Sequence, residues 1–211
     1  DVCSSDLIPA RPATEPELDI TDAASIARFV DGETRAVINC SAYTNVDGAE
    51  EHEALATKVN GEGVGLLVAR CDEVGAPLVH YSTDYVFDGQ GTSPYPVDHP
   101  TDPINAYGRS KRVGEEHVER SDGPHLIIRT SWPYAPWGQN FVKTIAKYAK
   151  ERDRLKVVND QRGRPTSAEH LARTSLALLE GGHRGTFHGT DGGECTWYDF
   201  AKAIAQHADP T

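Results

Sequence analysis

Short apolar runs alternate along this chain with longer amphipathic stretches, and no other feature limits its fold as strongly. The runs predict strands at 36–40, 78–82, 125–129, 155–158 and 185–188. The amphipathic stretches predict helices at 23–30, 50–73, 107–120, 140–151, 168–179 and 197–207. Strands that alternate with helices are the sequence form of β-α-β units, whose strands run parallel. The chain is therefore predicted to form an α/β fold around a parallel sheet.

Composition narrows the class of protein. A chain of 211 residues is long enough to bury one good core. Its formal net charge of −11, without a cluster of Lys and Arg, argues against nucleic acid or an anionic membrane as a partner. No run approaches the roughly 18 apolar residues of a membrane span, and no secretory signal begins the sequence. We expect an acidic, soluble protein.

Cysteine and histidine spacing points to neither disulfides nor a metal centre. The four cysteines lie far apart with no C-x-x-C pair: Cys3, Cys40, Cys71 and Cys195. They are predicted to be reduced thiols, mostly buried, which is typical of a cytoplasmic protein. The nine histidines show no spacing typical of metal ligands.

Tyr107 and Lys111 form the pair that most constrains the chemistry. Residues four apart on a helix share one face, so the ammonium can lie beside the phenol and favour its ionised form. Such a phenol can pass a proton to or from a substrate oxygen. The spacing alone is weak evidence, because it occurs by chance on many solvated helices.

The context of the pair strengthens the prediction of catalysis. The apolar run 78–81 reads as a buried strand, and three small polar residues follow it, Ser82, Thr83 and Asp84. Ligands of open α/β sheets bind at the carboxyl ends of the strands. A hydroxyl at this edge could bind the same substrate oxygen as Tyr107.

Three loop or turn segments have two interpretations each. The proline-rich stretch 88–105 is predicted to be a long loop, which either closes over the site or merely connects two elements. The glycine cluster 61–65 lacks the context of a phosphate loop and predicts a weakened or closely packed helix. Segment 162–166 is either an anion site at a helix start or a structural turn.

Six ordered segments resemble the extended short-chain dehydrogenase/reductases, and within them the dTDP-4-dehydrorhamnose reductase family. They follow the family's order and approximate spacing: 37–50, 80–87, 105–108, 128–132, 159–161 and 163–166. The resemblance covers about residues 19–205. It implies a Rossmann-like, doubly wound parallel sheet with part of a smaller substrate-binding lobe, roughly 132–140 and 155–211.

The resemblance also implies a role for each matching residue. Tyr107 would protonate the 4-keto oxygen, Thr83 would polarise it, and Lys111 would bind the cofactor ribose and lower the pKa of Tyr107. Asp84 and Trp132 would line the substrate side together with Thr83. NADPH or NADH would contact these residues besides Tyr107 and Lys111: Asp19, Ile20, Ala42, Tyr43, Thr44 and Tyr81. Members of the family can bridge subunits with Mg²⁺, for which Glu169 is the one matching position.

The family pattern fails at both ends. The family begins with a β-α-β unit whose glycine-rich turn holds the cofactor pyrophosphate, and residues 1–17 contain no such turn. We expect 1–17 to be disordered or foreign to the fold, 18–211 to form the domain, and the chain to be truncated at both ends. We accordingly expect these 211 residues alone to bind NAD(P)H weakly and to be inactive.

The resemblance implies a cytoplasmic NAD(P)H-dependent reductase that converts dTDP-4-dehydro-L-rhamnose to dTDP-L-rhamnose for cell-surface polysaccharide, and it makes a homodimer a candidate assembly. Two alternatives stay open. One is another nucleotide-sugar reductase or epimerase, because all of them use a Thr, Tyr and Lys set. The other is a non-catalytic subunit that resembles the regulatory β subunit of methionine adenosyltransferase. Intact Thr83, Tyr107 and Lys111 argue against that second alternative.

Overall fold

A parallel sheet of four strands forms the centre of the computed structural model, which describes residues 10–14 and 16–208. The strands lie in the order β1 (Val37–Asn39), β2 (Leu78–Thr83), β3 (His125–Thr130) and β7 (Gly185–His188). All three pairings are parallel, and the register places Asn39 beside His80 and Thr83 beside Thr130. The predicted α/β class is confirmed, as are four of the five predicted strands.

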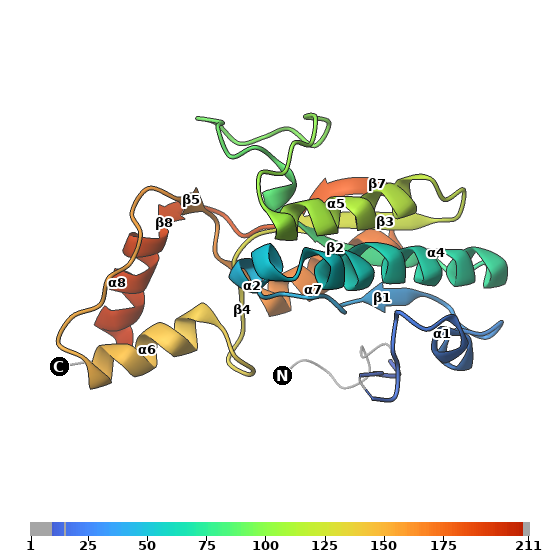
Figure 1. Cartoon of the computed structure of the whole chain (residues 1–211), viewed down its shortest axis with the longest axis horizontal. Coiled ribbons are helices and arrows are strands. Elements are labelled where there is room, and N and C mark those ends of the chain that lie inside the picture. Colours follow the sequence, from blue (N-terminus) through green and yellow to red (C-terminus); the bar gives the residue numbers. More distant parts are fainter. Residues whose placement is uncertain (1–9, 15, 209–211) are drawn as a thin grey trace.

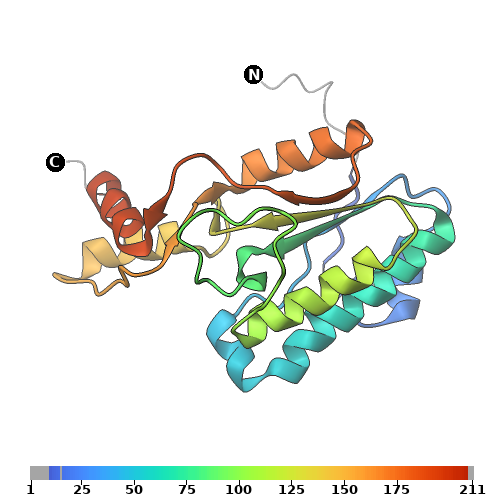
Figure 2. The ribbon, with the colours of Figure 1, turned by 90° about the horizontal axis from the view of Figure 1, so that it is seen from above.

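Helices cover both faces of this sheet (Figures 1 and 2). One face carries α1 (Ala23–Phe29), α4 (Gly63–Val74) and α5 (Ala106–Glu119), and the other carries α7 (Ala168–Glu180). The alternation of side chains along a strand sorts the core accordingly. Leu78 and Ile127 pack with α1 and α4, whereas Val79 and Ile128 pack against α7. This is the doubly wound arrangement that the family resemblance implies.

The predicted helix 50–73 is broken into four pieces. These are α2 (Val46–Glu51), α3 (Glu53–Thr57), a π-helical turn η1 (Lys58–Glu62) and α4. Glycine permits close contact here, because a Cβ at Gly61 would meet the side chain of Val113 at 2.6 Å and one at Gly65 would meet His117 at 2.9 Å. The prediction of a closely packed helix for the cluster 61–65 is confirmed.

A smaller lobe follows the end of β3. It contains β4 (Pro133–Tyr134), α6 (Phe141–Glu151), β5 (Arg162–Gly163), β6 (Thr166–Ser167), β8 (Cys195–Thr196) and α8 (Trp197–Ala208). The prediction of a strand at 155–158 was wrong. Leu155 and Val157 instead pack into the apolar cluster between α6 and α8. Periodicity misled here because an apolar segment that packs on helices looks like a strand in sequence.

The segment 88–105 is a long loop, as predicted. It follows a short 3₁₀ turn, η2 (Asp84–Val86), and contains neither helix nor strand. In Figure 1 it rises above the amino-terminal end of α5.

The amino-terminal prediction falls partly outside the described residues, which leave out 1–9 and 15. Over the part that is described, Arg11 stacks on the ring of Phe29 at 4.4 Å, and Leu18 packs on the core. Disorder over 1–17 and the domain boundary at 18 stay predictions. Cys40, Cys71 and Cys195 carry free thiols. None of the helices described here is long and apolar enough to span a bilayer.

Candidate active site

Tyr107 lies in the first turn of α5, which is tightly held. Asn105 caps the helix by accepting a hydrogen bond from the backbone N–H of Gly108 at 2.7 Å, and Glu50 accepts one from Ala106 at 2.8 Å. A Cβ at position 108 would collide with the backbone carbonyl oxygen of Tyr85. Glycine at this position therefore lets the start of α5 approach the end of β2.

The ring of Tyr107 joins two segments that the sequence assigned to the same site. It packs with Tyr43, from the loop that follows β1, around Ala49, Ala56 and Ala106. It also meets the ring of Tyr85 edge to face, with centroids 6.0 Å apart. The expected cofactor loop and the expected proton donor are thus brought together.

Lys111 lies buried on the next turn of α5, with 3% of its surface exposed. Its side-chain nitrogen donates to the backbone carbonyl oxygen of Tyr81 at 2.7 Å and lies 3.4 Å from Nε2 of His80. Burial lowers the pKa of Lys111 to about 8, and the charge of Glu115 opposes this shift.

Tyr107 is not activated in the way the sequence suggested. Burial raises the pKa of its phenol to about 12, and the charges of Asp84 and Tyr85 add to the rise. In this arrangement burial and the charge of Asp84 disfavour the phenolate, while the lysine is bound to the Tyr81 carbonyl. The expected lowering of this pKa by Lys111 stays a prediction.

Thr83 and Asp84 lie at the carboxyl end of β2, as expected. The Thr83 hydroxyl donates to Asp84 at 3.2 Å and accepts from the backbone N–H of Tyr85 at 3.1 Å. Burial raises the pKa of Asp84 from 3.8 to about 6, although the bond from Thr83 opposes the rise. The structure therefore places two ionisable groups with raised pKa values, Asp84 and Tyr107, at one edge of the sheet.

Three other residues expected to contact the cofactor, Tyr81, Ile20 and Asp19, have protein partners in the structure. The side chain of Tyr81 points to the opposite face of the sheet, where its hydroxyl donates to Ser175 of α7 at 2.9 Å. Only its carbonyl faces Lys111. Ile20 is buried against Gly63, while Asp19 accepts hydrogen bonds from Thr21 at the surface. Contacts of these residues, and of Ala42 and Thr44 in the loop after β1, with a cofactor stay predictions.

Trp132 forms the junction between the sheet and the smaller lobe. Its ring stacks on Trp197 with centroids 3.7 Å apart. The same ring occupies the space that a Cβ at position 163 would need, so glycine is required there. Its backbone has a φ of 48°, which is uncommon for a residue other than glycine. Segment 162–166 therefore has a packing role against Trp132, and its anion-binding role stays a prediction.

Sequence reasoning missed a buried ion pair beside the site. Arg129 of β3 donates to both carboxylate oxygens of Glu115 at 2.8 Å, and its third nitrogen donates to the carbonyl of Val97 at 3.0 Å. Burial raises the pKa of Glu115, but the bonds from Arg129 outweigh it and the pKa lies below its usual value. The pair thus fastens the loop 88–105 to the sheet. The sequence did contain a signal for Glu115, because this residue follows Lys111 by four positions and so shares its helix face.

Two hydroxyls at the carboxyl edge have no hydrogen-bond partner among the described residues. They belong to Ser82 and Thr130, and both are buried. Ser82 faces Glu115 and helps to lower the pKa of that carboxyl. Thr130 sits beside Thr83 in the register. Unpartnered buried hydroxyls are costly, so this edge is suited to a polar ligand.

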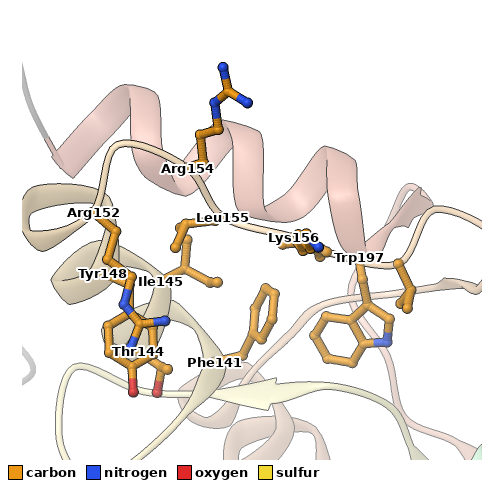
Figure 3. A pocket seen from close by; sticks show the side chains of 11 residues that line it. Phe141, Thr144, Ile145, Tyr148, Arg152, Arg154, Leu155, Lys156 and Trp197 are labelled. Carbon is orange, nitrogen blue, oxygen red and sulfur yellow. The ribbon is translucent and has the colours of Figure 1, made fainter.

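A separate cavity of about 670 Å³ lies in the smaller lobe (Figure 3). Its lining comes from α6, from α8 and from the segment between α6 and β5. It includes aromatic and basic side chains, among them Phe141, Tyr148, Arg152, Arg154 and Trp197. Neither Tyr107 nor Lys111 lines it, so the cavity is not where the predicted proton transfer takes place.

Glu169, the residue expected to bind Mg²⁺, pairs with a basic side chain in the structure. Glu169 forms an exposed ion pair with Arg173 at 2.8 Å. Over residues 10–14 and 16–208, no group of three or more His, Cys, Asp or Glu side chains is arranged to hold a metal. A metal at Glu169 stays a prediction.

Known proteins share both the sequence and the fold. The family described as RmlD substrate binding domain matches residues 4–211. The dTDP-4-dehydrorhamnose reductase of Burkholderia thailandensis is 43% identical over 203 residues, which are 92% of this chain and 68% of that protein. The dTDP-4-keto-6-deoxy-D-glucose reductase of Streptomyces niveus is 42% identical over 196 residues, with the same two coverages of 92% and 68%.

A solved structure gives the same result. The dTDP-4-dehydrorhamnose reductase of Bacillus anthracis, determined in complex with NADP, superimposes with a TM-score of 0.91 at 39% identity. The match covers 94% of this chain and 71% of that one.

Proposed function

Because this chain belongs to the RmlD substrate binding domain family, we propose that a protein containing it carries out the NADPH-dependent reduction of dTDP-4-dehydro-L-rhamnose to dTDP-L-rhamnose. The product serves the synthesis of cell-surface polysaccharide. One observation carries the proposal most directly. Tyr107, Lys111 and Thr83 converge on the carboxyl edge of a parallel sheet, beside the loop after β1.

The residues at this edge fit a bound nicotinamide nucleotide. Two buried hydroxyls, those of Ser82 and Thr130, have no protein partner there within the described part of the chain. Lys111 adds a donor at the same edge. A nicotinamide cofactor held there would supply the hydride for C4 of the sugar.

Tyr107 provides the proton for this reduction. Its raised pKa keeps the phenol protonated at neutral pH, so the proton that the reaction consumes is in place. The sugar oxygen becomes far more basic than a phenolate as negative charge develops on it, which favours the transfer. Thr83 donates a hydrogen bond to the same oxygen once its hydroxyl turns from Asp84, to which it donates in this structure. Lys111 would hold the ribose of a bound cofactor, and its positive charge would stabilise the phenolate that remains.

NADPH is the proposed cofactor in preference to NADH. The support is the relative from Bacillus anthracis, which was determined with NADP. Parallel titrations with NADPH and NADH, followed by the fluorescence of the reduced nicotinamide, test the preference. A lower dissociation constant for NADH would overturn it.

A second candidate substrate has specific support. The relative from Streptomyces niveus is named as a dTDP-4-keto-6-deoxy-D-glucose reductase at 42% identity. The chemistry at Tyr107 is the same for both sugars, since each presents a 4-keto group. A substrate panel of dTDP-4-keto sugars decides between them by kcat/KM. The proposed function predicts that dTDP-4-dehydro-L-rhamnose gives the highest value.

We further propose a cytoplasmic enzyme that acts as a homodimer. The location follows from the small nucleotide substrates of the proposed reaction. Sedimentation equilibrium of the purified protein tests the dimer, which predicts twice the chain mass. A single species at the chain mass would exclude it.

A further inference from the structure

His80 is a fully buried histidine that lies between Asn39 and Lys111. Its Nδ1 atom lies 3.1 Å from Nδ2 of Asn39, which is its neighbour across strands β1 and β2. Its Nε2 atom lies 3.4 Å from the Lys111 nitrogen. His80 itself is completely shielded from solvent.

The orientation of Asn39 follows from its other contact. The backbone N–H of Ser41 can only donate, and it lies 3.0 Å from the side-chain oxygen of Asn39. The amide oxygen of Asn39 is therefore the atom that faces Ser41, and its NH₂ group faces His80. An amide orientation that rests on a backbone N–H is well determined.

The orientation of Asn39 fixes the tautomer of His80. Because Asn39 donates to Nδ1, that atom must accept and carries no hydrogen. Burial, together with the charge of Lys111, places the pKa of His80 well below its usual value, so the ring is neutral. A neutral imidazole carries one N–H, which must then lie on Nε2. This N–H points at the lysine nitrogen.

We propose that His80 is a positioning residue for Lys111: held by Asn39 as the Nε2–H tautomer, it presents a donor to the lysine nitrogen and so disfavours the ammonium form there. The ammonium is consequently directed to the Tyr81 carbonyl and is weakly held on the His80 side. The proposal rests on the proposed function only in assigning Lys111 to the cofactor.

The other groups around Lys111 are compatible with this arrangement. Glu115 on the same helix favours the ammonium, but Arg129 from β3 and Arg112 from α5 already neutralise its carboxylate. Asn60 of the neighbouring turn η1 has its side chain bonded to Tyr43 and Ser110. Gly114 lets α5 approach this turn, because a Cβ there would collide with the backbone carbonyl oxygen of Asn60.

The tautomer can be measured without changing the protein. In a sample labelled with ¹⁵N-histidine, the Nδ1 shift of His80 should be that of an unprotonated acceptor and the Nε2 shift that of an N–H. A His80→Asn variant identifies the signals. An Nδ1–H tautomer, or an imidazolium at neutral pH, would overturn the proposal.

The consequence for Lys111 is tested by Asn39→Asp. A carboxylate at position 39 accepts from Nδ1–H, which moves the free acceptor to Nε2 and lets it bind the ammonium. The Lys111 ammonium gains one hydrogen bond, which should raise its titration midpoint by about one pH unit. The midpoint is measured from the ¹³Cε chemical shift of Lys111. The Lys111→Arg variant, which lacks this signal, assigns it. The pH limb of kcat/KM that reports Lys111 should move by the same amount.

Asn60→Asp is the matched control, because it adds a buried carboxylate near α5 without contacting His80. It should leave the His80 tautomer unchanged and move the Lys111 midpoint less. Equal shifts in the two variants would show that charge alone acts on Lys111, and the proposal would fall. The ¹⁵N and ¹³C measurements need no substrate, so a failure of the proposed reductase activity is distinguishable from a failure of this inference.

Discussion

The side-chain nitrogen of Lys111 lies 2.7 Å from the backbone carbonyl oxygen of Tyr81. This bond holds the ammonium on the strand rather than on the phenol of Tyr107, one helical turn away. Tyr107 consequently keeps its proton at neutral pH, because burial and the charge of Asp84 disfavour the phenolate. The site is thus arranged with a protonated phenol beside a lysine that the strand holds.

Loss of Lys111 should weaken cofactor binding as well as catalysis. In a protein that contains residues 1–211, Lys111→Ala removes the proposed ribose contact and the group that stabilises the phenolate, so Kd for NADPH and kcat both deteriorate. Thr83→Val, which removes the proposed bond to the substrate oxygen and the local bonds of that hydroxyl to Asp84 and Tyr85, should lower kcat while it leaves Kd nearly unchanged. Lys143→Ala on α6 is the control. Equal small effects of the first two variants would show that Thr83 and Lys111 do not form a catalytic set.

Asp84 should destabilise the folded protein above about pH 6. Its pKa rises from 3.8 to about 6 on folding, so the native state holds this proton more tightly than the unfolded state does. Stability from this group is therefore full below pH 3.8 and is lost as the pH rises through 6. Asp84→Asn should raise the free energy of unfolding at neutral pH, by at most about 3 kcal/mol, and change it little in acid. Urea unfolding at both pH values measures this, with exposed Asp122→Asn as control.

The pair of Glu115 and Arg129 should be a major source of stability for the loop 88–105. Glu115→Gln leaves a buried guanidinium without its counter-charge and should cost about 3–5 kcal/mol in the free energy of unfolding. Glu116→Gln, which breaks an exposed pair with Arg120, should cost about 0–1 kcal/mol. Proteolysis within 88–105 should also become faster in the first variant only. Similar unfolding curves for the two variants would contradict the role given to the buried pair.

Gly108 should tolerate no side chain. A Cβ there would collide with the Tyr85 carbonyl, so Gly108→Ala must move the start of α5 and with it Tyr107. We expect lower kcat and lower thermal stability. Gly32→Ala is a matched control, because a Cβ at Gly32 has nothing within 4 Å. It should be neutral or stabilise by about 0.4–1 kcal/mol. Wild-type kcat in Gly108→Ala would show that the close approach is not required.

The sequence predicted the sheet and its helices well because each apolar run has a clear boundary. The run 78–82 ends in polar residues, and Asn105 and Asn140 cap the helices that follow them. The strand predicted at 155–158 failed for the opposite reason. Its apolar residues pack on helices, and periodicity cannot distinguish that environment from a sheet.

The site was predictable as a set of residues but not as an arrangement of charges. Spacing placed Tyr107 and Lys111 on one helix face, and the structure agrees. Spacing could not show that the lysine binds the Tyr81 carbonyl, that Asp84 raises the pKa of Tyr107, or that the Tyr81 hydroxyl points away to Ser175. Those properties depend on burial and on partners that are distant in sequence.

The central claim is that Tyr107 donates the proton in an NADPH-dependent reduction of dTDP-4-dehydro-L-rhamnose. The direct measurement is substrate-dependent oxidation of NADPH by wild-type protein and by Tyr107→Phe, with Tyr198→Phe on the exposed face of α8 as control. We predict that kcat falls roughly 10²-fold or more in Tyr107→Phe, with little change in substrate binding, and that the control matches wild type. Near-wild-type turnover in Tyr107→Phe would contradict the account.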